Sequence, residues 1–158
     1  MRHRWISSTG WLVFGSRQLL HVWPSESAGE MLATVNESAV VWRYGTYSCI
    51  ILNDEPLDTA VIEIPMGIAF VRWSAAEDEN AMLRAARRTL NEIRAVRIGT
   101  LEVTRDEHLL FDAAMGGNVD EPYQPMPVSL NAGRYLVQTA RVTAGADGEV
   151  IALTHVLA

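Results

Sequence analysis

Short apolar runs separated by turn-forming residues cover most of the chain and predict a protein built mainly of β-strands. Residues 11–14 lie between two glycines, and residues 39–42 are followed by a second apolar run at 47–52. Apolar runs of this length, bounded by glycine, proline, asparagine or aspartate, are typical of strands. We therefore expect strands at all three places, with a hairpin through Gly45 between the last two.

The same pattern continues to the end of the chain. Residues 53–56, Asn-Asp-Glu-Pro, end the third strand because they favour turns and because proline cannot donate to a sheet. Further strands are predicted at residues 60–64, 67–73, 98–104, 108–112, 134–143 and 149–156. The first two and the last two of these have hairpin sequences between them. Residues 115–127, with three prolines and two glycines, predict a long irregular surface loop.

One segment has the period of an amphipathic helix instead. Its apolar residues recur at spacings of three and four: Met82, Leu83, Ala86, Leu90 and Ile93. Ser74 and Glu77 in front of them match a capping box, and acidic residues precede arginines, as the helix dipole favours. The sequence therefore predicts one principal helix at about residues 75–96. Two shorter helices, at 16–23 and between 27 and 34, are compatible with the pattern.

Strands on both sides of a single strong helix predict an α+β fold, with mostly antiparallel strands in a sandwich-like arrangement. A parallel, doubly wound sheet is disfavoured because it needs a helix between most of its strands. The chain has no internal repeat and no composition shift that would mark a boundary. We therefore expect residues 1–158 to form a single domain.

Charge narrows the classes of partner. The net charge is −6 and the isoelectric point is about 5.2. Because nucleic-acid binding requires a basic face, we expect no nucleic-acid partner, and the negative charge favours a basic protein as the partner. No apolar run approaches the ~20 residues of a membrane span, so no membrane partner is expected. The N-terminal segment lacks the uninterrupted apolar region of a signal peptide, which predicts a cytoplasmic protein.

The reactive side chains suggest no enzyme. All 13 basic residues are arginines, which excludes the lysines of phosphate loops and Schiff bases. The four histidines are scattered, and His108 and Asp112, four residues apart on a strand, would lie ~13 Å apart, too far to bind one ion. Hydrolase and dinucleotide motifs are absent too. We therefore expect no catalytic residues, no metal and no cofactor, and a buried, inert Cys49.

The five tryptophans leave an alternative open. Trp11, Trp42 and Trp73 fall in predicted strands and are expected in the core, whereas Trp5 and Trp23 flank turns and are expected to be partly exposed. Exposed tryptophans could serve as sugar platforms, so a carbohydrate-binding β-sandwich module is the main alternative function. A small hydrolase is a third, weaker interpretation.

Five segments, in one order along nearly the whole chain, resemble the immunity protein 21 family. They are residues 5–13 followed by Leu19, Leu20 and Trp23; 52–57 with Thr59; 70–73 before the acidic helix start; 110–112; and 132–135 before the last hairpin. Residues 24–47 have no such similarity. The resemblance implies an immunity protein that binds a cognate bacterial toxin in a polymorphic-toxin or contact-dependent system. It implies no catalytic residues.

Two groups of loop residues are the predicted contacts with such a partner. The first group follows the third strand and comprises Asp54, Glu55 and Asp58; the second lies in the proline-rich loop and comprises Asp120, Glu121 and Tyr123. Loops on small domains often carry binding residues, and acidic groups suit a basic toxin surface such as that of a nuclease. The alternative for the first group is a structural turn whose side chains cap backbone amides, and for the second a solvated loop. The oligomeric state is left open.

Overall fold

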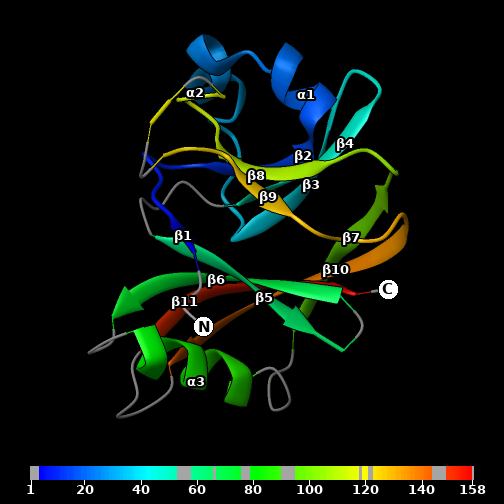
Figure 1. Cartoon of the computed structure of the whole chain (residues 1–158). Coiled ribbons are helices and arrows are strands. Elements are labelled where there is room, and N and C mark those ends of the chain that lie inside the picture. The colour runs from blue at the N-terminus through cyan, green and yellow to red at the C-terminus, as the bar shows by residue number, and fades with distance from the viewer. Residues whose placement is uncertain are drawn as a thin grey trace.

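Two antiparallel sheets form the body of the protein in a computed structural model (Figure 1). The structure describes residues 4–52, 58–65, 67–75, 79–89, 95–117, 119–120, 123–143 and 149–157. Sheet A comprises, in spatial order, β1 (Trp5–Ile6), β5 (Thr59–Ile64), β6 (Gly67–Ala75), β11 (Glu149–Leu157), β10 (Gly133–Thr143) and β7 (Val96–Val103). Sheet B comprises β3 (Ala39–Tyr44), β4 (Tyr47–Leu52), β2 (Leu12–Ser16), β8 (His108–Asp112) and β9 (Met126–Val128).

The helices cover the outer faces of the two sheets. Sheet B carries α1 (Arg17–Val22), the short 3-10 helix η1 (Ser25–Ser27) and α2 (Ala28–Met31), whereas α3 (Glu79–Thr89) packs against β6 and β11 of sheet A. The order of layers is therefore helices, sheet B, sheet A and α3, as Figure 1 shows. Within the described residues, none of the helices has the length and apolar character that a membrane span requires.

The main core lies between the two sheets. Phe14 of β2 meets Phe70 of β6 with ring centroids 5.2 Å apart, and Leu110 of β8 belongs to the same cluster. A second core lies on the other face of sheet B, where Val13 and Phe111 pack with the helical layer. Because β2 and β8 are covered on both faces, all five residues of each are buried. Burial on both faces explains why these strands read as continuous apolar runs rather than as alternating ones.

The predicted fold class and strands are confirmed. Tyr44 pairs with Tyr47 around Gly45, whose φ of +59° is easily reached by glycine, and Ile64 pairs with Gly67. The last two strands pair along most of their length. The two shorter helical segments correspond to α1, η1 and α2. Cys49 is buried as predicted, and its burial raises the pKa of its thiol to about 12.

The principal helix is confirmed, but its predicted ends are wrong. Ala75 pairs with Glu149 in β6 and β11, and Val96 pairs with Thr139 in β7 and β10, so both predicted end positions belong to strands. Ser74 also lies in β6 and is therefore not the N-cap. Pairing with β11 outweighs the local capping pattern, as tertiary contacts often outweigh propensity. Residues 76–78, which include Glu77, and 90–94 lie outside the described residues.

The chain crosses from sheet A to sheet B between β1 and β2, and a buried arginine holds one side of this crossing. The side chain of Arg72, on β6, is 1% exposed. Its Nη2 donates to Ser8 Oγ and to the carbonyl oxygen of Gly10, both at 3.3 Å, and its Nε donates to Thr59 Oγ1 at 3.2 Å. The guanidinium thus ties β5 and β6 to the crossing segment.

A buried carboxylate holds the other side. Asp112, the last residue of β8, is fully buried and accepts hydrogen bonds from both the amide and the hydroxyl of Thr9. It also accepts from the amides of Ala114 at 2.8 Å and Met115 at 2.9 Å, and so caps the turn that follows β8. These bonds replace the water that the carboxylate loses on burial.

Replacing Asp112 with alanine should destabilise the protein by about 3 kcal/mol, because the amides that it caps would lose a charged acceptor in a buried site. Urea unfolding followed by tryptophan fluorescence measures the change. Asp120→Ala is the matched control, since Asp120 is exposed and lies outside the crossing segment. An Asp112→Ala variant as stable as this control would contradict the assigned role.

Candidate functional site

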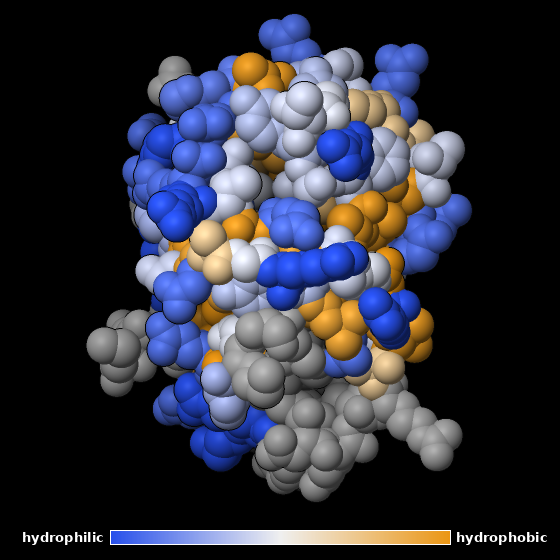
Figure 2. Space-filling view, turned by 90° about the vertical axis from the view of Figure 1, so that its right-hand side faces the viewer, coloured by the Kyte–Doolittle hydropathy of each residue, from blue (hydrophilic) through white to orange (hydrophobic). Residues whose placement is uncertain are grey.

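An open cavity of about 830 Å³ lies at the end of the sandwich where β8 begins. Ser16 pairs with His108 at this end, and Leu12 pairs with Asp112 at the other. We call the end at Ser16 and His108 the Asp106 end, and the end at Leu12 and Asp112 the Asp112 end. The cavity at the Asp106 end is called the Asp106 cavity. The β5–β6 hairpin, the β7–β8 turn and residues 128–131 surround it. Figure 2 faces this side of the molecule and shows apolar patches among hydrophilic side chains.

The Asp106 cavity has an apolar floor and a mostly acidic rim. Buried side chains of the inter-sheet core, Ile68, Val128 and Tyr135, form part of its lining. The charged residues that line it are Glu63, Arg105, Asp106 and Glu107. Acidic side chains therefore outnumber basic ones around a surface that also offers apolar contact.

Glu63 reaches the cavity because of strand alternation. It lies two residues from Val61, which packs against the inter-sheet core, and pairs with Ile68, so its side chain is on the inward face of sheet A. This position is at the mouth of the sandwich, and Glu63 is exposed. No hydrogen bond or ion pair joins it to another residue in the described part of the chain. It is an acceptor available to a bound molecule.

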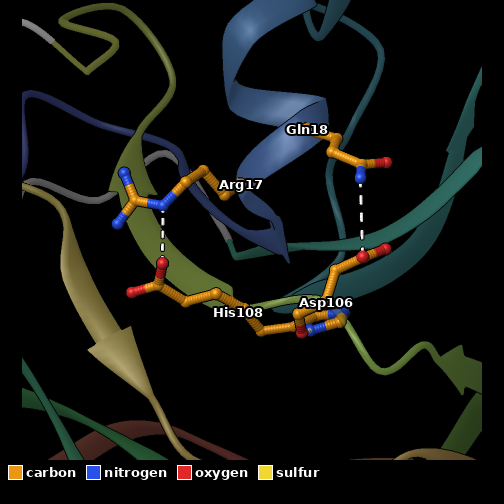
Figure 3. A network of polar contacts seen from close by, with 5 residues as sticks. Arg17, Gln18, Asp106 and His108 are labelled. Atoms are coloured by element: carbon orange, nitrogen blue, oxygen red, sulfur yellow. Dashed lines mark hydrogen bonds and ion pairs between the residues drawn. The ribbon is translucent and has the colours of Figure 1, made fainter.

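The β7–β8 turn is held in place by the start of α1 (Figure 3). The Arg17 amide donates to the Glu107 carbonyl oxygen at 2.8 Å, and Arg17 Nε meets Glu107 Oε2 at 2.6 Å. Gln18 Nε2 donates to Asp106 Oδ1 at 3.4 Å, and Thr104 Oγ1 donates to Asp106 Oδ2 at 3.1 Å. The orientation of the turn is therefore set before any partner binds.

The ion pair changes the titration of Glu107. The hydrogen bond from Arg17 is the main cause that lowers the pKa of Glu107, and the same hydrogen bond raises the pKa of Arg17. Glu107 thus has its countercharge within the protein. The carboxylates of Glu63 and Asp106 have no such ion pair within the described residues, so most of the uncompensated negative charge of the rim belongs to them.

His108 adds a buried aromatic ring to the lining. The residue is 5% exposed, and its ring packs on Phe14 with centroids 5.5 Å apart. Nδ1 lies 2.8 Å from the carbonyl oxygen of Asp106, which can only accept, so the hydrogen of this bond is assigned to Nδ1. The ring lines both the Asp106 cavity and a smaller cavity of about 200 Å³ beside the β3–β4 hairpin.

A metal centre does not form from these groups. Among the residues that the structure describes, no three histidine, cysteine, aspartate or glutamate side chains gather closely enough to hold an ion. His108 and Asp112 lie at opposite ends of the five-residue strand β8, as expected from their spacing.

The residues predicted as contacts lie elsewhere. Asp58, just before β5, is exposed and bound to Ser7. Asp120 is exposed and Tyr123 is half-buried in the connection from β8 to β9, where the Tyr123 amide donates to the Asp120 carbonyl oxygen at 3.1 Å. No described contact joins the two groups. Asp54, Glu55 and Glu121 lie outside the described residues.

Sequence reasoning missed the acidic rim. Residues 105–107 fall between the predicted strands 98–104 and 108–112, and Glu63 is the one charged residue of the predicted strand 60–64, but neither was among the predicted contacts. That lone charge was the available signal, because a charged residue inside a strand needs either solvent or a partner. Which face it occupies, and what lies across from it, depends on the pairing of distant strands.

The tryptophans do not form a sugar-binding platform in the described structure. Trp23 is 6% exposed, so the expected partial exposure is wrong; its Nε1 donates to the Ala113 carbonyl oxygen at 2.9 Å and its ring packs edge-on to Phe111. Trp5, Trp11 and Trp42 are half-buried, and the side chain of Trp73 lies outside the described ones. The carbohydrate-binding alternative is not favoured, because no described tryptophan is exposed.

Fold and cavity define a small antiparallel β-sandwich protein with a partly apolar cavity and an acidic rim at one end. The chain belongs to the immunity protein 21 family, whose model matches residues 4–148. The resemblance predicted from five sequence segments is thereby confirmed, and the protein is an immunity protein by family. Comparison with curated proteins and with solved structures gave no match.

The Arg17–Glu107 pair makes a measurable prediction about titration. In the Arg17→Met variant the pKa of Glu107 should rise towards its ordinary range, because the group that favours the charged carboxylate is gone. In the wild type the stabilisation is present at neutral pH and is lost as the pH falls through the lowered pKa. NMR titration of side-chain carboxyl carbons measures both. Arg43→Met, at an exposed position on β3, is the control and should leave the pKa of Glu107 unchanged. An unchanged pKa of Glu107 in the Arg17→Met variant would disprove the coupling.

Proposed function

We propose that this protein binds a cognate bacterial toxin and neutralises it by covering the toxin's active or substrate-binding surface. The observation that carries this proposal is the match of residues 4–148 to immunity protein 21. An inhibitor that acts by occlusion needs a stable surface and no catalytic groups of its own, so we take the protein to be a stoichiometric binder rather than an enzyme. Its site of action would be the cytoplasm of the cell that makes it.

Electrostatics suggest the kind of toxin surface. The net charge of −6 favours a basic partner, because opposite charges accelerate association and disfavour wrong partners. Nuclease toxins require a basic groove to hold phosphates, which makes a nuclease from a polymorphic or contact-dependent toxin system the favoured target class. An acidic protein covering that groove would exclude the nucleic acid.

Acidic groups are available at both ends of the sandwich. The contacts proposed from the sequence remain Asp54, Glu55, Asp58, Asp120, Glu121 and Tyr123, of which the structure describes Asp58 beside the crossing segment and Asp120 and Tyr123 in the connection from β8 to β9. At the Asp106 end, the rim of the cavity supplies Glu63 and Asp106. The alternative role for Asp58 is structural, since it accepts from Ser7 and so helps to hold the crossing segment.

Co-expression tests the proposed function. Bacteria that produce the toxic domain encoded next to this gene should survive when this protein is co-produced, and the two proteins should purify together. Binding should weaken as salt is raised, because the attraction between exposed charges is screened. A catalytically inactive toxin variant provides the control for production of the partner. An active toxin that kills the cells despite soluble, folded protein, with no complex formed, would contradict the proposal for this pair.

A further inference from the structure

We infer that the Asp106 cavity and the groove that continues from it receive a basic, partly apolar segment of the toxin. This inference rests on the proposed function and deepens it by assigning the binding surface and the chemistry of its occupant. Four features carry it: the continuity of the groove, the edge of β9, the unpaired acceptors, and the fixed orientation of the β7–β8 turn.

The cavity continues along the side of the sandwich. A second hollow of about 300 Å³ lies between β5 and β9 and shares Glu63, Ile68, Val128 and Ser129 with the first. Apolar side chains line this part also, including Met126, which is 6% exposed. The two hollows therefore form one elongated groove, which suits a segment of chain better than a single side chain.

The edge of β9 determines how such a segment can bind. β9 is the last strand of sheet B and has only three residues, Met126–Val128. Pro127 at its centre is exposed and has no N–H to offer to an added strand. Recognition here must therefore come mainly from side chains that enter the groove, rather than from extension of the sheet.

The charges in the groove select a cationic occupant. Glu63 faces inward without a partner in the described residues, and the hydrogen bonds that Asp106 accepts come from the neutral groups of Gln18 and Thr104 rather than from a countercharge. The almost fully buried ring of His108 also lines this part of the groove. Two arginines also line the groove, Arg105 in the first hollow and Arg4 in the second, where Arg4 Nη2 donates to the carbonyl oxygens of Gln124 and Pro125. An arginine or lysine side chain of the partner can donate to Glu63 and Asp106, whereas an acidic one would be repelled.

Rigid placement favours affinity. Arg17 and Gln18 of α1 hold the β7–β8 turn, and Ser16 Oγ caps α1 by accepting from the Leu19 amide at 3.1 Å. Because this part of the rim is ordered before binding, less conformational entropy is lost when a partner docks.

Charge variants of Glu63 test the inference. The probe is the purified toxic domain encoded next to this gene, in a catalytically inactive form, and the readout is Kd by calorimetry. Glu63→Arg should weaken binding by ~10-fold or more, with Glu63→Gln intermediate, because a desolvated charge contact is lost and then reversed. Asp106→Asn, which keeps the size of the side chain, should weaken binding in the same direction.

The matched control is Glu30→Arg on α2, an exposed position in the helical layer that covers the other face of sheet B. It makes the same change of net charge and should shift Kd by less than ~2-fold. Thermal unfolding of each variant checks that it is folded.

The outcomes separate this inference from the proposed function. If the wild type binds tightly and Glu63→Arg and Asp106→Asn bind equally well, the groove is not the docking surface, although the proposed function stands. Weakening by Asp58→Arg or Asp120→Arg alone would likewise place the toxin elsewhere and overturn the inference. If the wild type itself neither binds nor neutralises an active toxin, both the proposed function and the assigned docking surface are wrong.

Discussion

The crossing of the chain between the two sheets, held by a buried cation and a buried anion, is the constraint on which the rest of the structure depends. Arg72 of sheet A binds Ser8 and Gly10, and Asp112 of sheet B binds Thr9 between them. Burying either charge without these bonds would cost several kcal/mol, so the segment and the two side chains order one another. Because β1 pairs in sheet A and β2 in sheet B, this short segment also fixes how the sheets face each other.

The two ends of the sandwich differ because of what strand alternation places on the inward faces. On β8 the inward positions include His108, Leu110 and Asp112, so the middle of the strand joins the apolar core while polar groups occupy both ends. At the Asp112 end the polar groups are consumed by the crossing and by the turn that follows β8. At the Asp106 end His108 borders a cavity. The same alternation thus supplies stability at one end and lines the proposed docking groove at the other.

Local pattern was sufficient to predict nine of the strands, the hairpins and the fold class, but not the two-residue β1 or the three-residue β9, whose first two residues were assigned to the irregular loop at 115–127. It failed where distant pairing decides the outcome: the capping pattern at Ser74 gives way to the ladder between β6 and β11, and the helix is shorter than its sequence suggests. Trp23 flanks a turn yet is buried, because that turn packs beneath the end of β8. Acidic loops were the obvious contacts, whereas Glu63 becomes a candidate only once β5 is paired and its inward face is known. No feature of the sequence indicates that Glu63 lies near the turn at Asp106.

Hydrogen–deuterium exchange of the free protein and of its complex with the toxic domain is the most direct test of where the toxin binds. We expect slower exchange in the complex at residues 105–108 and 126–131, which border the Asp106 cavity and its groove. Exchange at residues 7–11 and 113–117, around the crossing at the Asp112 end, should be unchanged. Protection confined to those two segments, with the residues of the groove unaffected, would contradict the assignment of the docking surface.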